Sequence, residues 1–337
     1  MIEGNLHGFT PSCSVVICTR DRPEWLNRCL DSVSRLTYPK FDVLVVDNAP
    51  KDVQSCEIAI RWGVRYVVES EPGLSRARNR GVRACTAELI AFLDDDSMPE
   101  LEWLTALVVE FNDPEVMAVT GRICPLNAKT EDDQVGAWIG GLDLCGQERR
   151  TADRGTPFWF GLSNFGGIGD GGNMAFRRQA FDVVPGFDER LGRGVILNGG
   201  EEHYAFFSLI DRGYRVIYTP FAIVQHPFPT GLKELRARHF KAKAASTGYL
   251  TLLFVEQPEY RCAVVRYAFE ALLGIPRPWH QQQRKHRPRI ISPLKIILAY
   301  LLGPLLYVWT RLVHRDGHRE IASVASNGLS SRTEMLD

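Results

Sequence analysis

Residues 89–96 read LIAFLDDD and set an apolar run directly against three adjacent acids. Such an unbroken apolar run predicts a strand that is buried on both faces, as in a parallel sheet. The carboxylates of Asp94, Asp95 and Asp96 repel one another. A divalent cation bound together with phosphate oxygens is the natural compensation, because hard cations prefer oxygen ligands. A solvated acidic loop that caps the next helix is the alternative explanation for a bare run of aspartates.

On both sides of this stretch, apolar runs alternate with segments of helical periodicity. Strands are predicted at residues 12–18, 43–46, 64–68, 89–93 and 116–120, and helices at 25–36, 52–61, 74–85 and 100–111. This alternation predicts a mostly parallel, doubly wound α/β sheet, whose ligands bind at the carboxyl ends of its strands. Between 122 and 172 the pattern weakens and glycines accumulate, which predicts long loops around the site.

The overall charge argues against a dedicated nucleic-acid binder, because 40 basic and 40 acidic residues cancel over the 337-residue chain. Residues 1–230 carry 23 basic and 32 acidic side chains, and residues 231–337 carry 17 and 8, so the second part is basic. The eight cysteines show no CxxC spacing, and the first residues do not resemble a signal peptide. We therefore expect a cytoplasmic protein with reduced thiols.

The C-terminal part of the sequence differs in character from the rest. Between Ala271 and Arg315 there are eight Lys or Arg residues and no acid. Within this part, the 21 residues of 293–313 are strongly apolar but are interrupted by Gly303-Pro304. A spanning helix, a re-entrant segment, an interfacial helix and a helix packed on the rest of the protein all fit this pattern. The basic charge favours docking on the inner face of the cell membrane.

The ordered motifs between residues 14 and 226 resemble those of family 2 glycosyltransferases, inverting enzymes of the GT-A fold that use nucleotide sugars. They are the opening strand and turn at 15–22, VVDN at 45–48, GLSRARNRG at 73–81, FLDDD at 92–96, GNMAFRR at 172–178, GFDE at 186–189, GEE at 200–202 and His226. The sequence contains no P-loop motif, and no GxGxxG motif follows the first strand. Neither of these other nucleotide-binding motifs therefore competes with this interpretation.

The resemblance implies a role for several of these residues. Asp94 matches the carboxylate that meets the ribose or the metal, and Asp96 matches the metal ligand. Asp47 corresponds to the acid that contacts the nucleotide base, and Thr19 to a nucleotide contact after the first strand. Arg78 lies in the segment that reaches the base or the diphosphate, although a solvated helix face is the alternative for some of the arginines there. The remaining residues expected around the nucleotide are Arg20, Asp21 and Asp95.

An inverting transfer also needs a general base, because the acceptor hydroxyl is a poor nucleophile until it loses its proton. The family usually has Glu-Asp after the glycine-rich loop, whereas this chain has Glu201-Glu202. The resemblance therefore assigns the base to Glu202, and Glu201 stays an alternative. Acids also favour the first turn of any helix through its dipole.

Two further positions complete the expected site. In the resemblance, His226 adds an imidazole to the metal site, since neutral imidazole is a suitable ligand for Mn²⁺ and related ions. Gly172-Asn173 is expected to form the floor beneath the donor sugar and the acceptor, because glycine permits close approach and asparagine can bond sugar hydroxyls.

The leading hypothesis is a glycosyltransferase that depends on Mn²⁺ or Mg²⁺ and transfers a sugar to a glycan or lipid-linked acceptor during cell-surface glycan or polysaccharide synthesis. The alternatives are a sugar-1-phosphate nucleotidyltransferase, which would be expected to carry glycines in the loop at 19–23, and an inactive sugar-binding protein. We expect a catalytic domain at 1–235, with its nucleotide-sugar half at about 12–121 and its acceptor half at about 122–235. A helical region at 236–315 and a polar, disordered tail at 316–337 are expected to follow.

Overall fold

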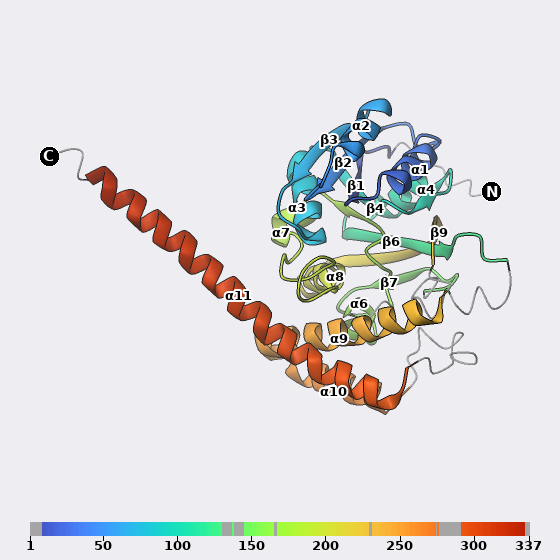
Figure 1. Ribbon diagram of the computed structural model, residues 1–337. Helices are drawn as coiled ribbons and strands as arrows, with labels where there is room; N and C mark the ends of the chain where they lie inside the picture. The colour runs from blue at the N-terminus through green and yellow to red at the C-terminus, as the bar shows by residue number, and fades with distance from the viewer. Residues whose placement is uncertain are drawn as a thin grey trace.

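The computed structural model shows a mixed α/β domain followed by a group of C-terminal helices (Figure 1). The residues that it describes are 9–129, 137, 145–164, 167–228, 231–273, 275 and 291–333.

The first part of the domain is the predicted alternation of strands and helices. It consists of β1 (Cys13–Thr19), α1 (Pro23–Val33), β2 (Phe41–Asn48), α2 (Gln54–Arg61), β3 (Arg65–Glu69), α3 (Leu74–Ala84) and β4 (Leu89–Asp94). These strands pair in parallel in the order β3-β2-β1-β4. Their carboxyl ends therefore meet at one edge of the sheet, where Thr19, Asn48 and Asp94 terminate their strands.

The second part of the domain extends the same sheet. It consists of β5 (Met98–Pro99), α4 (Trp103–Val108), η1 (Val109–Asn112), β6 (Val116–Pro125), β7 (Arg150–Ala152), α6 (Trp159–Asn164), β8 (Asn173–Arg177), α7 (Ala180–Val183), α8 (Glu201–Asp211) and β9 (Arg215–His226). Strand β8 lies between β4 and β6 and is antiparallel to both. Leu93 therefore pairs with Asn173, which brings the glycine-rich loop before β8 beside the acidic end of β4.

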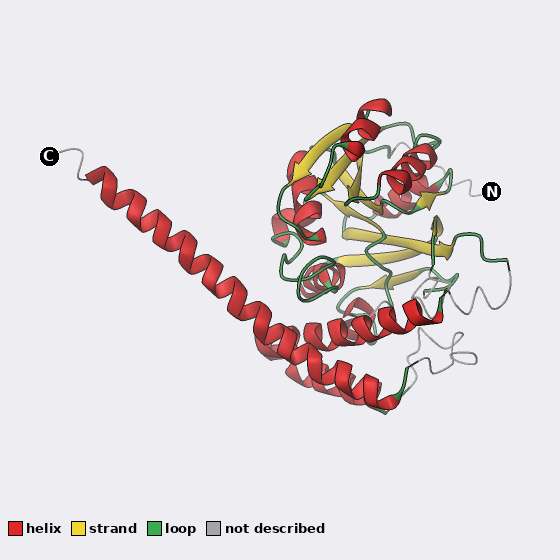
Figure 2. Cartoon of the chain, in the orientation of Figure 1, coloured by secondary structure: helices red, strands yellow, loops and turns green. Residues whose placement is uncertain are grey.

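Helices cover both faces of the sheet, and each face has its own apolar core (Figure 2). On one side, Trp103 and Phe111 are fully buried with α1 and α4. On the other, Phe92 and Phe176 pack edge to face with Phe187, with ring centroids 5.4 and 5.7 Å apart. The strand ends that carry the acidic residues are thus fixed by a packed interior.

The C-terminal helices are α9 (Leu232–Glu256), η2 (Pro258–Tyr260), α10 (Arg261–Leu272) and α11 (Pro293–Thr333). Helix α9 packs against the α/β domain, where Tyr249 and Leu253 join Leu191 and Phe207 in a third apolar cluster. Helix α11 runs along α9 and then projects away from the domain (Figure 1). The sequence predicts a disordered tail from residue 316, and that boundary stays a prediction.

Helices α9 and α11 approach closely because two glycines face one another. A Cβ atom at Gly303 would lie 2.5 Å from the backbone nitrogen of Gly248. Pro304 follows inside α11 without ending the helix. The Gly303-Pro304 interruption therefore lies where α11 packs on α9.

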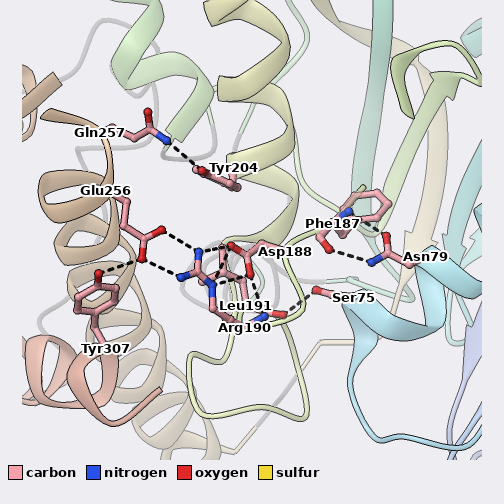
Figure 3. Close-up of polar contacts among 10 residues, drawn as sticks. All are labelled: Ser75, Asn79, Phe187, Asp188, Arg190, Leu191, Tyr204, Glu256, Gln257 and Tyr307. Carbon is pink, nitrogen blue, oxygen red and sulfur yellow. Dashed lines mark hydrogen bonds and ion pairs between the residues drawn. The ribbon is translucent and has the colours of Figure 1, made fainter. Parts of the chain in front are cut away.

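An ion-pair network joins the C-terminal helices to the loop before α8 (Figure 3). Arg190 donates to Asp188 with distances of 2.6–3.2 Å and to both carboxylate oxygens of Glu256 at 2.7 and 2.8 Å. Tyr307 of α11 donates to the same Glu256 at 2.9 Å. On its other side the loop is held by α3, because Ser75 donates to the carbonyl of Leu191 at 2.6 Å. This loop leads directly to the acids at the start of α8.

Candidate active site

The structure brings together the three residues that the sequence assigns to a metal. Asp94 and Asp96 follow β4, and His226 ends β9. One ligand atom of each lies within 4.8 Å of the others. Asp96 and His226 are buried, whereas Asp94 is partly open, with 21% of its side chain exposed.

The hydrogen bonding of His226 tests whether these residues fit a cation. Its Nδ1 lies 2.5 Å from the carbonyl oxygen of Pro227, so Nδ1 carries a proton and the lone pair of a neutral ring is on Nε2. Nε2 lies 3.1 Å from Oδ1 of Asp96. In the neutral ring two lone pairs face each other there, and either a proton or a cation must lie between them. Ligand atoms about 3 Å apart suit adjacent positions around a cation with bonds of about 2.1 Å.

The pKa directions agree with this geometry. Burial alone would raise the pKa of Asp96, but the hydrogen bond and charge of His226 lower it below its usual range. Conversely, burial would lower the pKa of His226, and Asp96 raises it. Two carboxylates and an imidazole therefore fit a divalent cation that accepts oxygen and nitrogen ligands.

Asp95 has a different role from its neighbours. Oδ2 of Asp95 accepts a hydrogen bond of 2.7 Å from Thr19, and Oδ1 lies 2.8 Å from Arg22, which also contacts Asp96 at 2.7 Å. Burial raises the pKa of Asp95 to about 6, against the opposing effects of Arg22 and Thr19. Arg22, to which the sequence analysis gave no individual role, thus holds two of the three acids in place.

A cavity of about 280 Å³ opens at this edge of the sheet. Among the predicted nucleotide residues, Thr19, Arg20, Asp94 and Asp95 line it. Asn48 also lines the cavity and is fixed by the backbone, since its amide donates to Glu71 and accepts from Gly73 at 2.7 and 2.8 Å.

Two of the predicted nucleotide residues are engaged elsewhere in the structure. Asp47 is fully buried, accepts a 2.9 Å hydrogen bond from Tyr66 and leaves Oδ1 without a partner. Burial raises the pKa of its carboxyl group. Asp21 forms a 2.7 Å ion pair with Lys51 at the surface. Neither is among the residues that line the cavity.

Arg78 is buried and held by contacts within the protein. Its side chain is 3% exposed, lies 2.8 Å from Glu201 and donates to the carbonyl of Gly171 at 2.9 Å. Nη2 of Arg78 also lies 3.8 Å from Oδ1 of Asp94. Arg78 therefore links the start of α8 to the acidic end of β4 and has no exposed guanidinium for the donor.

The two acids of α8 are both buried but differ in their partners. Glu201 is paired with Arg78, whereas none of the described arginines forms an ion pair with Glu202; Oε2 of each acid is buried without a hydrogen-bond partner. Burial raises the pKa of Glu201 to about 7, and repulsion from Glu202 adds to this. Burial raises the pKa of Glu202, and the negative charge of Asp170 raises it further. An unpartnered carboxylate oxygen with a raised pKa is suited to accept a proton near neutral pH.

Gly200 places these acids, because it takes a left-handed φ of +93° immediately before α8. A Cβ there would lie 3.1 Å from the ring of Tyr249, which comes from α9. The C-terminal region therefore shapes the base position, although the resemblance ends at residue 226.

The two members of the expected glycine-rich floor have different surroundings. A Cβ at Gly172 would lie 3.0 Å from Oδ2 of Asp94, so a side chain there would crowd the metal ligands. Asn173, in contrast, is fully buried and accepts from Trp103 at 2.8 Å. Its nitrogen donates to the carbonyls of Arg122 and Ala222 at 3.0 and 2.8 Å. Its amide therefore ties strands together, and a contact of Asn173 with the sugar stays a prediction.

Sequence reasoning missed Arg193, which lines the cavity from the loop before α8. It also missed Asp170, whose negative charge raises the pKa of Glu202. The glycines on both sides of Arg193 were the signal in the sequence, since they let the backbone approach Gly73 and Ser75 at the start of α3 closely.

The chain is similar to known glycosyltransferases. The family described as Glycosyl transferase family 2 matches residues 14–184. The pre-mycofactocin glycosyltransferase of Mycobacterium tuberculosis is 29% identical over 258 residues, covering 75% of this chain and 49% of that protein. The glucosyl-dolichyl phosphate glucuronosyltransferase of Haloferax volcanii is 27% identical over 225 residues, covering 63% of this chain and 68% of that protein. The chain thus spans about half the length of the first of these relatives.

Among solved structures, the mannosyltransferase PcManGT of Pyrobaculum calidifontis, in complex with GDP-Man and Mn²⁺, has a similar fold. The match covers 96% of this chain and 81% of that one, with a TM-score of 0.52 and 18% sequence identity. This likeness concerns the fold, and it extends into the C-terminal helices.

Proposed function

Since the chain belongs to glycosyl transferase family 2, we propose that it is an inverting, divalent-metal-dependent glycosyltransferase that uses a nucleotide-diphosphate sugar. The relatives described above are glycosyltransferases, and PcManGT was solved with a nucleotide sugar and Mn²⁺. No observation favours a nucleotidyltransferase.

The observation that carries this proposal is the position of the Asp94–Asp96–His226 cluster. Asp94 belongs both to the cluster and to the wall of the cavity that Thr19, Arg20 and Asn48 line. A cation held there would meet the phosphates of a nucleotide whose base and ribose occupy the cavity. When bound, the cation neutralises charge that develops on the departing diphosphate.

The residues of this chain then act on the acceptor. Glu202 removes the proton of the acceptor hydroxyl as its oxygen attacks the anomeric carbon from the side opposite the leaving group. The bond to the diphosphate oxygen breaks in the same displacement, so the configuration inverts. Arg78 favours the charged form of Glu201 and holds it beside the base, and it joins the first turn of α8 to Asp94. Both acids also benefit from the positive end of the α8 dipole.

The acceptor is proposed to be lipid-linked and to lie at the cytoplasmic face of the membrane. Pro293–His314 is long and apolar enough to cross a membrane. One face of this segment packs on α9 through Ala299, Tyr307 and Thr310, which are buried. The opposite face exposes large apolar side chains at Leu294, Ile297, Leu298, Leu301, Leu305, Val308, Trp309 and Leu312. A helix docked on one face and apolar on the other suits the membrane interface.

Sedimentation with vesicles containing phosphatidylserine tests the membrane proposal. The full chain is expected to pellet with these vesicles, and high salt is expected to release it only in part, because salt screens charge and leaves apolar insertion intact. A triple variant, Leu301→Gln, Leu305→Gln and Trp309→Gln, should remain in the supernatant and keep its fold, since these side chains are 63–66% exposed. Wild-type protein that stays in the supernatant at low salt would contradict the membrane proposal and leave the transfer activity standing.

Transfer itself is tested by the release of nucleoside diphosphate from a panel of nucleotide sugars, with a bacterial lipid extract as acceptor. The proposal predicts release that requires Mn²⁺ or Mg²⁺, and a product whose anomeric configuration, determined by NMR, is opposite to that of the donor. A product of retained configuration would contradict the role given to Glu202.

A further inference from the structure

The loop before α8 is held at its start by an arginine of its own. This loop comprises residues 184–200, between α7 and α8. Nε and Nη2 of Arg190 lie 3.0 and 2.6 Å from the two carboxylate oxygens of Asp188. On the other side, Nη1 and Nη2 lie 2.7 and 2.8 Å from the two oxygens of Glu256 (Figure 3). The guanidinium is therefore held between two carboxylates, each in a two-point contact.

The second of these carboxylates belongs to the C-terminal helices. Glu256 is the last residue of α9, and it also accepts a 2.9 Å hydrogen bond from Tyr307 of α11. The side chains of Arg190 and Glu256 are only 26% and 23% exposed, so salt screens this pair less than an ion pair at the surface. Helix α9, together with α11, thus holds the start of the loop.

Two residues after Arg190, the backbone of the loop lies against Glu201. Gly192 has a left-handed φ of +104°, and a Cβ there would lie 3.2 Å from the carboxyl carbon of Glu201 and 2.8 Å from Oγ of Ser75. The loop therefore packs directly on the acid that is paired with Arg78. Since a single residue separates Gly192 from Arg190, the position of this contact depends on how Arg190 is held.

The end of the loop is held by the same helix. Gly200 packs on the ring of Tyr249 from α9, and Leu191 and Leu197 of the loop are buried in the apolar cluster that contains Tyr249. Apolar packing keeps the loop on α9, but it is non-directional. The ion pair at the start of the loop is directional, because two parallel hydrogen bonds fix the angle at which the groups meet. The pair therefore adds the precision that apolar packing lacks.

We propose that Arg190 is a positioning residue for the base Glu202, and that Glu256 of α9 acts through it. The pair fixes the loop on α9, the loop holds Glu201, and Glu201 precedes the base in the first turn of α8. This inference rests on the proposed function, in which Glu202 is the base, and it adds a requirement for the C-terminal helices in the transfer step. Helix α9 lies outside residues 14–184, which match the family.

Steady-state kinetics of the full-length protein test this inference, with the nucleotide sugar that the wild type uses and the bacterial lipid extract as acceptor. Arg190→Lys keeps the charge but cannot donate in parallel to both carboxylates, and Glu256→Gln keeps the shape but loses the charge. Each variant is expected to lower kcat by about 10–100-fold, because a displacement of about 1 Å caused far from the chemistry can cost 10²-fold.

Affinity for the nucleoside diphosphate of that sugar, titrated with Mn²⁺, should be unchanged in both variants. Arg193, which lines the cavity from the same loop, is fixed separately on α3, because its carbonyl accepts a 2.9 Å hydrogen bond from the backbone nitrogen of Leu74. The expected result is therefore a loss of kcat at constant diphosphate affinity.

The pH profile of kcat separates positioning from a loss of stability. Burial raises the pKa of Glu202. A loosened loop admits water to the base, so in both variants the rise of kcat with pH should move to lower pH. The titratable and charged groups that face Glu202 are unaltered by either substitution. They are Glu201 and His203 of α8, Arg78 of α3, Asp170 of the loop before β8 and Tyr249 of α9.

Glu259→Gln is the matched control, since Glu259 is an exposed acid three residues after Glu256, and it should behave as the wild type does. Where Arg190→Lys does not fold, Glu256→Gln decides alone, because its amide still accepts a hydrogen bond from Arg190.

Variants at Arg190 and Glu256 with the kcat of the control overturn the inference, whatever their Tm, and leave the proposed function intact. A lower kcat with the pH profile of the control also overturns it. Equal loss of kcat and of diphosphate affinity does so too, because it indicates displacement of the whole cavity. Wild-type protein that transfers sugar from no donor contradicts the proposed function, and the inference with it.

Discussion

The guanidinium of Arg78 lies 2.8 Å from the carboxylate of Glu201, and the two side chains are only 3% and 5% exposed. This buried pair separates the roles of two adjacent acids that the sequence leaves as alternatives. Each acid has one buried oxygen without a hydrogen-bond partner, but Glu201 compensates the buried cation of Arg78, whereas none of the described arginines pairs with Glu202. The geometry therefore favours Glu202 as the base that the proposed transfer requires.

Glu202→Gln should lower kcat by about 10²–10⁴-fold, the usual contribution of a general base, because the amide cannot accept the proton. Donor affinity should survive, since Glu202 is not among the residues that line the nucleotide cavity. Steady-state rates together with donor titration measure both quantities. A variant that turns over normally would remove Glu202 from the mechanism.

Glu201→Gln should show its main effect in stability. It leaves the buried Arg78 without a full charge partner, and breaking a charged hydrogen bond costs about 1.5–3 kcal/mol. Urea denaturation of the variant and of wild type gives this difference. Severe loss of rate with unchanged stability would instead move the base to Glu201.

The pH dependence of kcat should follow the carboxyl group of Glu202. Burial raises its pKa, so the group holds its proton to a higher pH than an ordinary glutamic acid. Because the base acts only when deprotonated, kcat should rise with pH through this raised pKa and fall as the pH is lowered. In Glu202→Gln the residual rate should lose this dependence. A wild-type rate that is flat from pH 5 to 8 would rule out a base with a raised pKa.

Asp96→Asn should weaken Mn²⁺ binding by more than the 10–100-fold typical of losing an outer-shell partner, because Asp96 is a proposed ligand. Titration of Mn²⁺ followed by electron paramagnetic resonance measures the free ion. Asp182→Asn is the control, since Asp182 is an exposed acid on α7. Equal Mn²⁺ affinity of the two variants would show that the cation binds elsewhere.

Tyr307→Phe should lower the free energy of unfolding by about 0.5–1.5 kcal/mol, the net value of a typical hydrogen bond. Tyr307 donates to Glu256, which in turn is paired with Arg190 in the loop that leads to Arg193 (Figure 3). Tyr300→Phe, on the same helix, should have no such effect. Identical urea midpoints for the two variants would show that the Glu256 network does not hold α11 to the domain.

The sequence predicts the first half of the sheet and the metal cluster well, because each rests on a local pattern. The apolar runs correspond to buried strands, and Asp94, Asp96 and His226 follow strands that end at the same edge. The hydrogen bonding of Asn173 could not be predicted, because nothing local reveals that its strand is inserted antiparallel between β4 and β6. The side-chain amide of Asn173 forms its hydrogen bonds to neighbouring strands and to Trp103.

The contribution of α9 could not be predicted, because it depends on long-range packing. Tyr249, which packs beneath Gly200, belongs to a helix whose sequence carries no motif. The orientation of Arg78 is of the same kind, since Glu201 lies 123 residues further along the chain. Spacing within α3 alone gives no information on such a partner.

Calorimetric titration of the protein with nucleotide sugars, with Mn²⁺ and with the metal removed by EDTA, tests the central claim most directly. Binding that depends on the cluster of Asp94, Asp96 and His226 should appear for at least one nucleotide sugar with Mn²⁺, and should largely disappear with EDTA or in Asp96→Asn. Because such a ligand binds only the folded state, it should also raise the Tm of the wild-type protein. Binding that is equally tight with EDTA and in Asp96→Asn, or no binding of any nucleotide sugar, would contradict the account.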